Sequence, residues 1–154
     1  MTKLVPPHGA QSLQPLLVPE DKRADELKRA ASLKKVPMTS REVSDLFMLG
    51  MGAYTPLAGF MGAASWRHVC TEMKLEDGLF WPIPITLSAT QELADTIATG
   101  EEVALTDGDS GEILGTLVVA EKYAIDKTLE CESVFGTADP KRAGTRRRRH
   151  RSGA

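Results

Sequence analysis

The segment from Gly50 to Met61 constrains the fold of this chain more than any other part of the sequence. It reads GMGAYTPLAGFM, so it is largely apolar yet contains three glycines and a proline. Glycine permits turns and close backbone approach but weakens regular helices and strands. We therefore expect a tightly packed, turn-rich segment. A phosphate-binding loop is the less favoured interpretation, because the sequence has no GxxxxGK[ST] motif and no GxGxxG motif after a strand.

Helical patterns dominate the first half of the chain and strand patterns the second half. Thr39 and Glu42 fit a capping box, which predicts a helix start at residue 40. Pro37 is expected to end the preceding helix. Apolar spacing and turn signals predict helices over residues 20–35, 40–49, 62–75, 91–98 and 125–136, and strands over residues 79–87, 102–106 and 112–120. Residues 1–19 are expected to be extended, and the whole is expected to be an α+β fold.

The overall composition is that of a globular protein. The chain has 154 residues, of which 42% are hydrophobic and 26% charged, which is typical of one folded domain. We find no apolar run long enough for a transmembrane helix and no secretory signal, so we expect a cytoplasmic protein without membrane contact. The strand candidate at residues 79–87 includes Trp81, for which burial in a core would make truncation to alanine cost about 3–5 kcal/mol.

Charge is distributed unevenly along the chain. Residues 141–154 carry seven basic and no acidic side chains, so the first 140 residues have a net charge of −9. We expect residues 141–154 to form a disordered basic tail, because they contain no apolar side chain larger than alanine. A solvated extension is the favoured interpretation of this tail. The alternative is an arm that binds nucleic acid non-specifically through Arg146–Arg149.

Histidine and cysteine are the first side chains to consider for catalysis. His68 is expected on a helix, whereas His8 and His150 lie near the two ends of the chain. None has a recognisable nucleophile sequence beside it, so we favour solvated histidines over a general base. Cys70 and Cys131 cannot form a disulfide framework and lack nearby metal-ligand residues, so both are expected to be small buried hydrophobic residues.

The acidic loop from Asp107 to Glu112 resembles a calcium-binding loop only superficially. It lacks the twelve-residue spacing and the terminal glutamate of such a loop, and we favour a hairpin turn. The residues themselves therefore assign no reaction, and no catalytic, cofactor-binding or metal-binding residue is predicted.

Three segments of the chain resemble sulfate adenylyltransferase, also called ATP sulfurylase. Residues 50–61 are similar to its "G-x-(F/Y)-(S/T)-P-L-x-G-F-M" segment. Residues 75–87, LEDGLFWPIPITL, are similar to its "L-x-D-G-x-x-(W/F)-P-(I/V)-P-(I/V)-x-L" segment. Residues 134–140, VFGTADP, are similar to the segment that leads to "H-P-G-V". The order and spacing also agree, and the similarity runs from about Gly9 to Pro140.

The resemblance implies that residues 1–140 form the first domain of such an enzyme, a PUA-like pseudo-barrel with antiparallel strands and flanking helices. The family makes adenosine 5′-phosphosulfate and pyrophosphate from ATP and sulfate, and its active site lies in a second, nucleotidyltransferase domain. The signatures of that domain, Gln-x-Arg-Asn-Pro-x-His-x-x-His and Gly-Arg-Asp-His, are absent from this sequence. We therefore expect a domain that binds neither substrate and is inactive alone.

The resemblance also suggests what this domain contacts. The expected partners are the catalytic domain of the same enzyme and further copies of the chain. Residues 50–61 and Phe80–Trp81 are the candidates for packing against that catalytic domain. An RNA-binding or structural PUA-like module is the alternative function. The pathway, which either assimilates sulfate or oxidises reduced sulfur, is left open.

The sequence departs from the family pattern just after Pro140, where the arginine-rich stretch replaces "H-P-G-V". A frame shift or a truncation of the coding sequence is our hypothesis for this change. Reading the downstream DNA in the other frames would test it, because the missing histidine signature should appear there.

Overall fold

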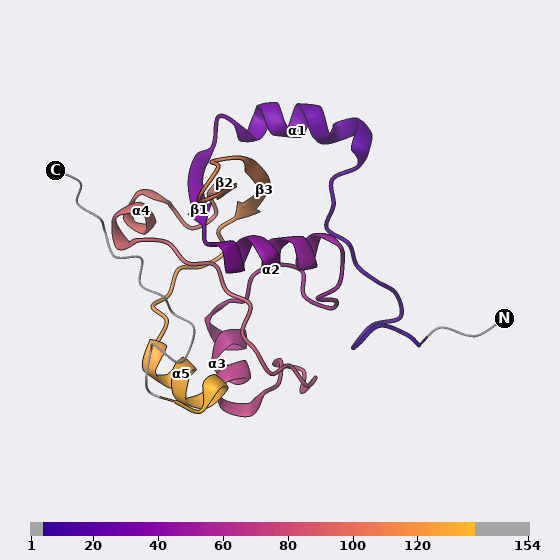
Figure 1. The fold of residues 1–154 in the computed structure, drawn as a ribbon, viewed down its shortest axis with the longest axis vertical. Helices are drawn as coiled ribbons and strands as arrows, with labels where there is room; N and C mark the ends of the chain where they lie inside the picture. The colour runs from indigo at the N-terminus through magenta and orange to yellow at the C-terminus, as the bar shows by residue number, and fades with distance from the viewer. Residues whose placement is uncertain (1–4, 138–154) are drawn as a thin grey trace.

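The fold is seen in a computed structural model, which describes residues 5–137. A small sheet lies between α1 on one side and α2 on the other, while α3 and α5 form a separate helical layer beyond α2 (Figure 1). The expectations for the basic tail and for His150 concern residues outside the described part. The elements are the 3-10 helix Glu20–Lys22, α1 (Arg23–Ala30), β1 (Lys34–Met38), α2 (Ser40–Gly50), α3 (Ala63–Glu72), α4 (Gln91–Thr96), β2 (Glu102–Asp107), β3 (Ile113–Val118) and α5 (Lys127–Phe135).

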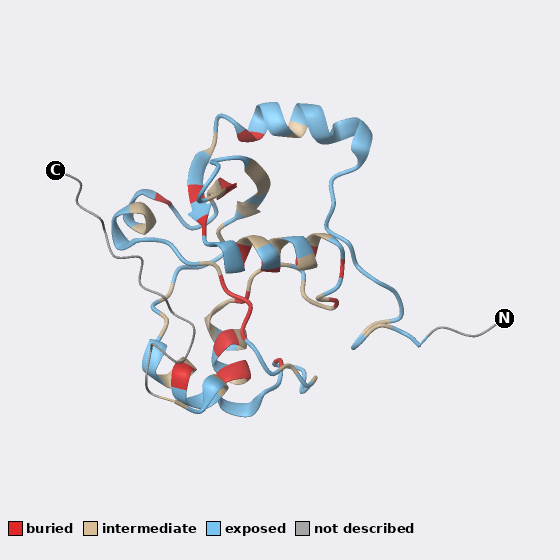
Figure 2. Ribbon diagram, viewed as in Figure 1, coloured by how far each residue is buried: buried red, intermediate tan, exposed pale blue. Residues whose placement is uncertain are grey.

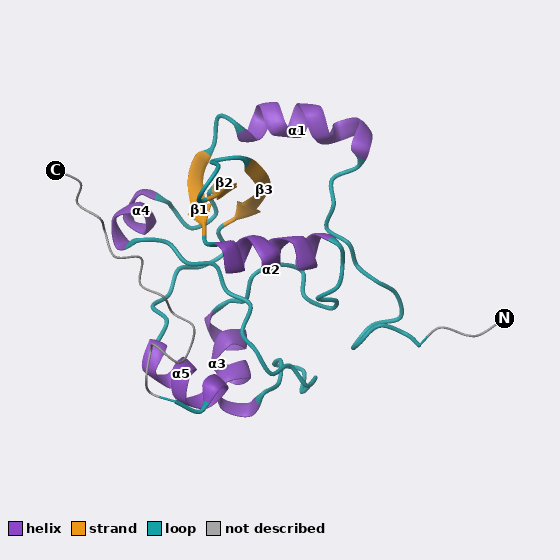
Figure 3. Cartoon of the chain, viewed as in Figure 1, coloured by secondary structure: helices purple, strands orange, loops and turns teal. Residues whose placement is uncertain are grey.

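The sheet has three strands in the order β1-β2-β3. β2 and β3 form the expected antiparallel hairpin, with a register irregularity between Leu105 and Thr106. β1 runs parallel to β2, with Lys34 opposite Val103 and Met38 opposite Asp107. The predicted α+β class is therefore confirmed, with a mixed sheet surrounded by helices and long loops (Figure 3).

The strand β1 was not expected from the sequence. We predicted one helix over residues 20–35, but the helix stops at Ala30 and the chain becomes a strand at Lys34. In that strand, Val36 and Met38 are buried while the lysines are exposed. The pairing with β2, which comes almost 70 residues later, stabilises β1, and no local pattern encodes such a distant partner.

The predicted strand over residues 79–87 is also wrong. Only an isolated bridge between Lys74 and Phe80 forms there, and the rest of the segment has no regular structure. Pro82 and Pro84 lack the backbone donors that a sheet needs. The segment still contributes to the interior, because Ile85 and Thr86 are buried.

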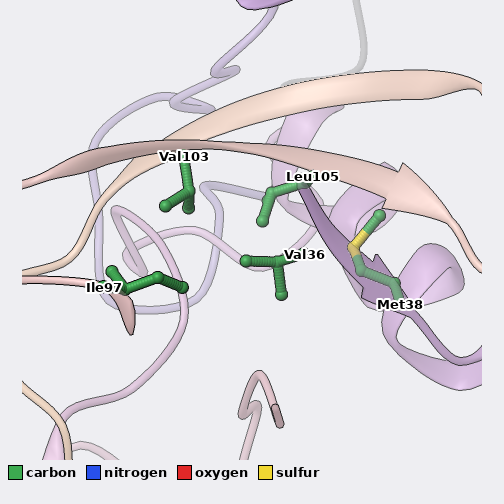
Figure 4. Close-up of a cluster of buried hydrophobic side chains, with 5 residues drawn as sticks. All are labelled: Val36, Met38, Ile97, Val103 and Leu105. Atoms are coloured by element: carbon green, nitrogen blue, oxygen red, sulfur yellow. The ribbon is translucent and has the colours of Figure 1, made fainter. Parts of the chain in front are cut away.

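Two groups of buried side chains form the core. The first joins the sheet to α4 and consists of Val36, Met38, Ile97, Val103 and Leu105 (Figure 4). The second lies between α2 and α3 and consists of Leu49, Met61, Val69, Leu75 and Ile85. Buried residues gather along β1, β2 and the inner sides of α2 and α3, whereas residues 5–19 and most of α1 are exposed (Figure 2). No helix within residues 5–137 is long and apolar enough to cross a membrane.

Candidate functional site

The residues from Leu13 to Val18, here called the strap, lie against the turn-rich segment at residues 50–61. The Leu16 N–H donates to the Gly50 carbonyl at 3.0 Å, and the Gln14 N–H donates to the Thr55 hydroxyl at 2.9 Å. Gly52 has a φ of 76°, and a Cβ there would lie 2.9 Å from the Pro15 nitrogen. The glycines therefore let the backbone turn and let the strap approach closely.

A hollow of about 360 Å³ opens between the strap, α1, α2 and β3. We call it the strap hollow. It is lined mainly by apolar side chains, and its charged lining residues are Arg23 and Glu26. Five large hydrophobic residues that are largely exposed to solvent lie on its walls: Leu16, Leu17, Val18, Leu27 and Phe47. An apolar concave surface of this kind marks a place where other groups bind.

A second hollow, of about 680 Å³, lies between α4, the start of α3 and residues 117–127. Several of its polar groups are engaged within the domain. Lys122 Nζ donates to the Ala94 and Ile97 carbonyls, and Glu121 accepts the Ala63 N–H at 2.7 Å. The Tyr123 hydroxyl donates to the Met61 carbonyl, and burial raises the pKa of Tyr123 to about 12. These groups hold the loop in place rather than binding an anion.

The two described histidines, His8 and His68, have different polar partners. His8 Nε2 donates to the Phe80 carbonyl at 2.8 Å. His68 lies on α3 with its nearest acid, Glu72, at 3.8 Å. Among residues 5–137, neither histidine has a serine or a cysteine side chain as its polar partner.

Cys70 and Cys131 are both free and buried, on the paired helices α3 and α5. Burial raises the pKa of the Cys70 thiol to about 11, so this thiol stays protonated and unreactive near neutral pH. Trp66 packs at the same helix pair, and its Nε1 donates to Glu130 at 2.8 Å.

The acidic loop after β2 is a hairpin turn. The Asp107 carboxylate accepts the backbone N–H groups of Asp109 and Ser110, and these bonds lower the pKa of Asp107. Among residues 5–137, no group of histidine, cysteine or acidic side chains is arranged to hold a metal ion.

The two segments proposed as packing surfaces differ in exposure. Residues 50–61 contribute Gly50, Ala58, Gly59 and Phe60 to the strap hollow. Phe80 is largely exposed, whereas Trp81 is half-buried and packs edge-on against Tyr54 at 5.8 Å. The glycine-rich motif at residues 50–61 therefore correctly indicated part of this surface. No pattern in the sequence indicated that the strap and β3 form the other walls of the strap hollow.

The chain belongs to the PUA-like domain family, whose model matches residues 5–151.

The related proteins are sulfate adenylyltransferases. The chain is 59% identical over 140 residues to the enzyme of Syntrophobacter fumaroxidans, covering 90% of this chain and 34% of the enzyme. It is 54% identical over 142 residues to the enzyme of Chlorobaculum tepidum, with 92% and 35% covered. The match is to the N-terminal part of these enzymes, so the chain spans about a third of their length.

A solved structure described as a hexameric APS kinase from Thiobacillus denitrificans has a similar fold. It superposes with a TM-score of 0.68 at 38% identity, over 80% of this chain and 24% of that one.

Proposed function

We propose that this chain provides the N-terminal, non-catalytic domain of a sulfate adenylyltransferase. In this proposal, residues 1–140 form the domain and residues 141–154 a separate basic tail, in a cytoplasmic protein. The match to the N-terminal third of enzymes with that name, at 59% identity, carries the proposal. The relatives do not favour the alternative of an RNA-binding module.

The reaction itself, the joining of ATP and sulfate with release of pyrophosphate, is assigned to the part of the enzyme that this chain does not match. Adenylyl transfer needs cationic and hydrogen-bonding groups fixed around the phosphates. The strap hollow has Arg23 and Glu26 on its walls, so its charges are balanced. In the second hollow, Lys122 is already bound to two carbonyls, and Lys127 is the other lysine on its walls. Residues 5–137 carry 20 acidic and 11 basic side chains, a net negative charge that repels both substrates.

This domain acts as a scaffold for the catalytic part and for assembly with further copies, as the hexameric relative suggests for this fold. Its exposed apolar surfaces around residues 50–61 and Phe80 are available for such packing.

A pyrophosphate-exchange assay tests the proposal. The purified chain, mixed with ATP, sulfate and labelled pyrophosphate, is expected to show no exchange. A hybrid in which residues 5–137 replace the matching part of the Syntrophobacter fumaroxidans enzyme is expected to be active. Exchange by the chain alone, or a folded hybrid without activity, would contradict the proposal.

A further inference from the structure

Residues 120–136, here called the arm, lie outside both groups of core residues. The arm consists of a loop and α5. Among residues 5–137, neither the two core groups nor the partly buried hydrophobic side chains packed against them include a residue beyond Val119. Within α5, Cys131 is the one buried residue. Burial of apolar surface is the main force that stabilises a fold, so it contributes little to the attachment of the arm.

The backbone bonds that tie this end of the chain to the domain stop at Val119. Its N–H donates to the Glu101 carbonyl at 2.9 Å, and its carbonyl accepts the Gly100 N–H at 2.8 Å. From residue 120 to residue 136 of the described chain, the hydrogen bonds found to the rest of the domain come from side chains. Val119 is therefore the place where a hinge for the arm would lie.

Three consecutive side chains, here called the latch, attach the loop of the arm to three different places: Glu121, Lys122 and Tyr123. Glu121 accepts the Ala63 N–H at the start of α3, at 2.7 Å. Lys122 donates to two carbonyls at the end of α4, at 2.9 and 2.7 Å. Helix starts carry a partial positive charge and helix ends a partial negative charge, so each of the two charged side chains suits its partner.

Two further bonds hold the arm close to α3. The Tyr123 hydroxyl donates to the Met61 carbonyl at 2.8 Å, and Glu130 of α5 accepts the Trp66 indole N–H at 2.8 Å. The side chains of the latch are exposed or only half-buried, so water can replace their bonds. A segment with few buried apolar contacts and exposed hydrogen bonds is one that opens locally.

The loop of the arm forms one wall of the second hollow. Every residue from Leu117 to Ile125 lines it, and the other walls come from residues 57–62 and from α4. Release of the latch would therefore remove one wall of this hollow of about 680 Å³ and leave the other walls in place.

We propose that the arm is a lid over the second hollow, which opens as one unit about Val119 when the latch is released. The sheet and both core groups keep all their residues in the open state, so the rest of the domain stays folded. Opening requires no residue outside this chain. It separates α5 from α3, against which α5 packs, and so exposes the thiol of Cys131.

Hydrogen exchange of the full 154-residue chain, measured at increasing urea below the unfolding transition, tests whether the arm opens separately. Local opening exposes little surface and responds weakly to urea, whereas global unfolding responds strongly. Exchange in α5 is expected to be nearly independent of urea, while exchange in β2 accelerates steeply. If α5 and β2 show the same dependence on urea, the arm opens only when the whole domain unfolds, and the proposal is wrong.

Lys122→Met and Lys127→Met are a matched pair that tests the latch. Both lysines line the second hollow, but the bonds to the carbonyls at the end of α4 come from Lys122. Labelling by N-ethylmaleimide, with peptide mapping to separate Cys131 from Cys70, measures the opening. Lys122→Met is expected to accelerate labelling of Cys131 about tenfold or more, and Lys127→Met about twofold or less.

Gly62→Ala and Gly59→Ala test the same latch from outside the arm. Gly62 has a φ of −77°, which suits alanine, but a Cβ there would collide with the Glu121 carboxylate, whereas Gly59 faces open space. Gly62→Ala should therefore displace Glu121 and accelerate labelling of Cys131, and Gly59→Ala should leave the rate unchanged. Unchanged exchange in β2 shows that each variant is folded. Equal labelling rates within either pair would overturn the proposed latch.

Discussion

Glu42 joins the start of α2 to Ser88, 46 residues further along the chain. One carboxylate oxygen accepts the Ser88 N–H at 2.7 Å and the Ser88 hydroxyl at 2.6 Å. The other accepts the N–H and the hydroxyl of Thr39, both at 2.7 Å. The side chain is almost fully buried, so a single carboxylate both completes the helix cap and fixes the irregular segment that carries Ile85 into the core.

Glu42→Ala should therefore lower the free energy of unfolding by about 3 kcal/mol, because it leaves several donors without an acceptor in a buried place. Urea denaturation followed by circular dichroism measures the change. Glu72→Ala, on the exposed side of α3, is the control and should stay within about 0.5 kcal/mol of the wild type. If both variants lower the free energy of unfolding equally, the bonds from Glu42 to Ser88 do not stabilise the fold.

Glycine-to-alanine variants can separate two reasons for a glycine: a positive φ in a turn, and close contact with a neighbouring backbone. Gly52 has a positive φ and lies against Pro15, Gly78 has a positive φ of 87° in open space, and Gly59 has neither constraint. Gly78→Ala should lower stability by about 1–2 kcal/mol, Gly52→Ala by more, and Gly59→Ala by about 0.5 kcal/mol or less. If the denaturation midpoints of the Gly52 and Gly78 variants coincide, the strap does not press against Gly52.

Local signals in the sequence predicted the elements that are stabilised locally. The capping box at Thr39 forms as expected and starts α2, and the turn after Asp107 forms the hairpin of β2 and β3. Elements that depend on distant partners were missed. The strand β1 needs β2, and the segment around Ile85 is held by Glu42 rather than by a sheet.

The candidate surface was predictable only in part for the same reason. The glycines near residue 52 marked a close approach, but the strap that they receive lies more than 30 residues earlier in the chain. The part of β3 in this surface becomes visible only when the fold is known, because its sequence is that of an ordinary apolar strand.

The Asp45 carboxyl gives the stability a pH dependence of unusual sign. Burial raises its pKa, although the Tyr54 hydroxyl and the Arg41 charge act in the opposite direction. A raised pKa means that folding favours the neutral acid, so its stabilising contribution is present below the unfolded pKa and is lost as the pH rises through the folded pKa.

Lowering the pH from about 7 towards about 4 should therefore stabilise the wild type relative to Asp45→Asn. Urea denaturation of both proteins across this range measures the difference. A constant offset between Asp45→Asn and the wild type across this range would mean that Asp45 titrates at its ordinary pKa in the folded protein.

The two tryptophans should respond differently to truncation, because one is enclosed and the other is only half-buried. Trp66 is 5% exposed and bonds to Glu130 through its indole N–H, so Trp66→Ala should cost about 3–5 kcal/mol. Trp81 keeps one side open and contacts Tyr54 and the ring of His8, so Trp81→Ala should cost about 2 kcal/mol. Denaturation midpoints of the two variants test this order. If Trp81→Ala is as destabilising as Trp66→Ala, then Trp81 is buried in the core between α2 and α3 and is not half-exposed beside Phe80.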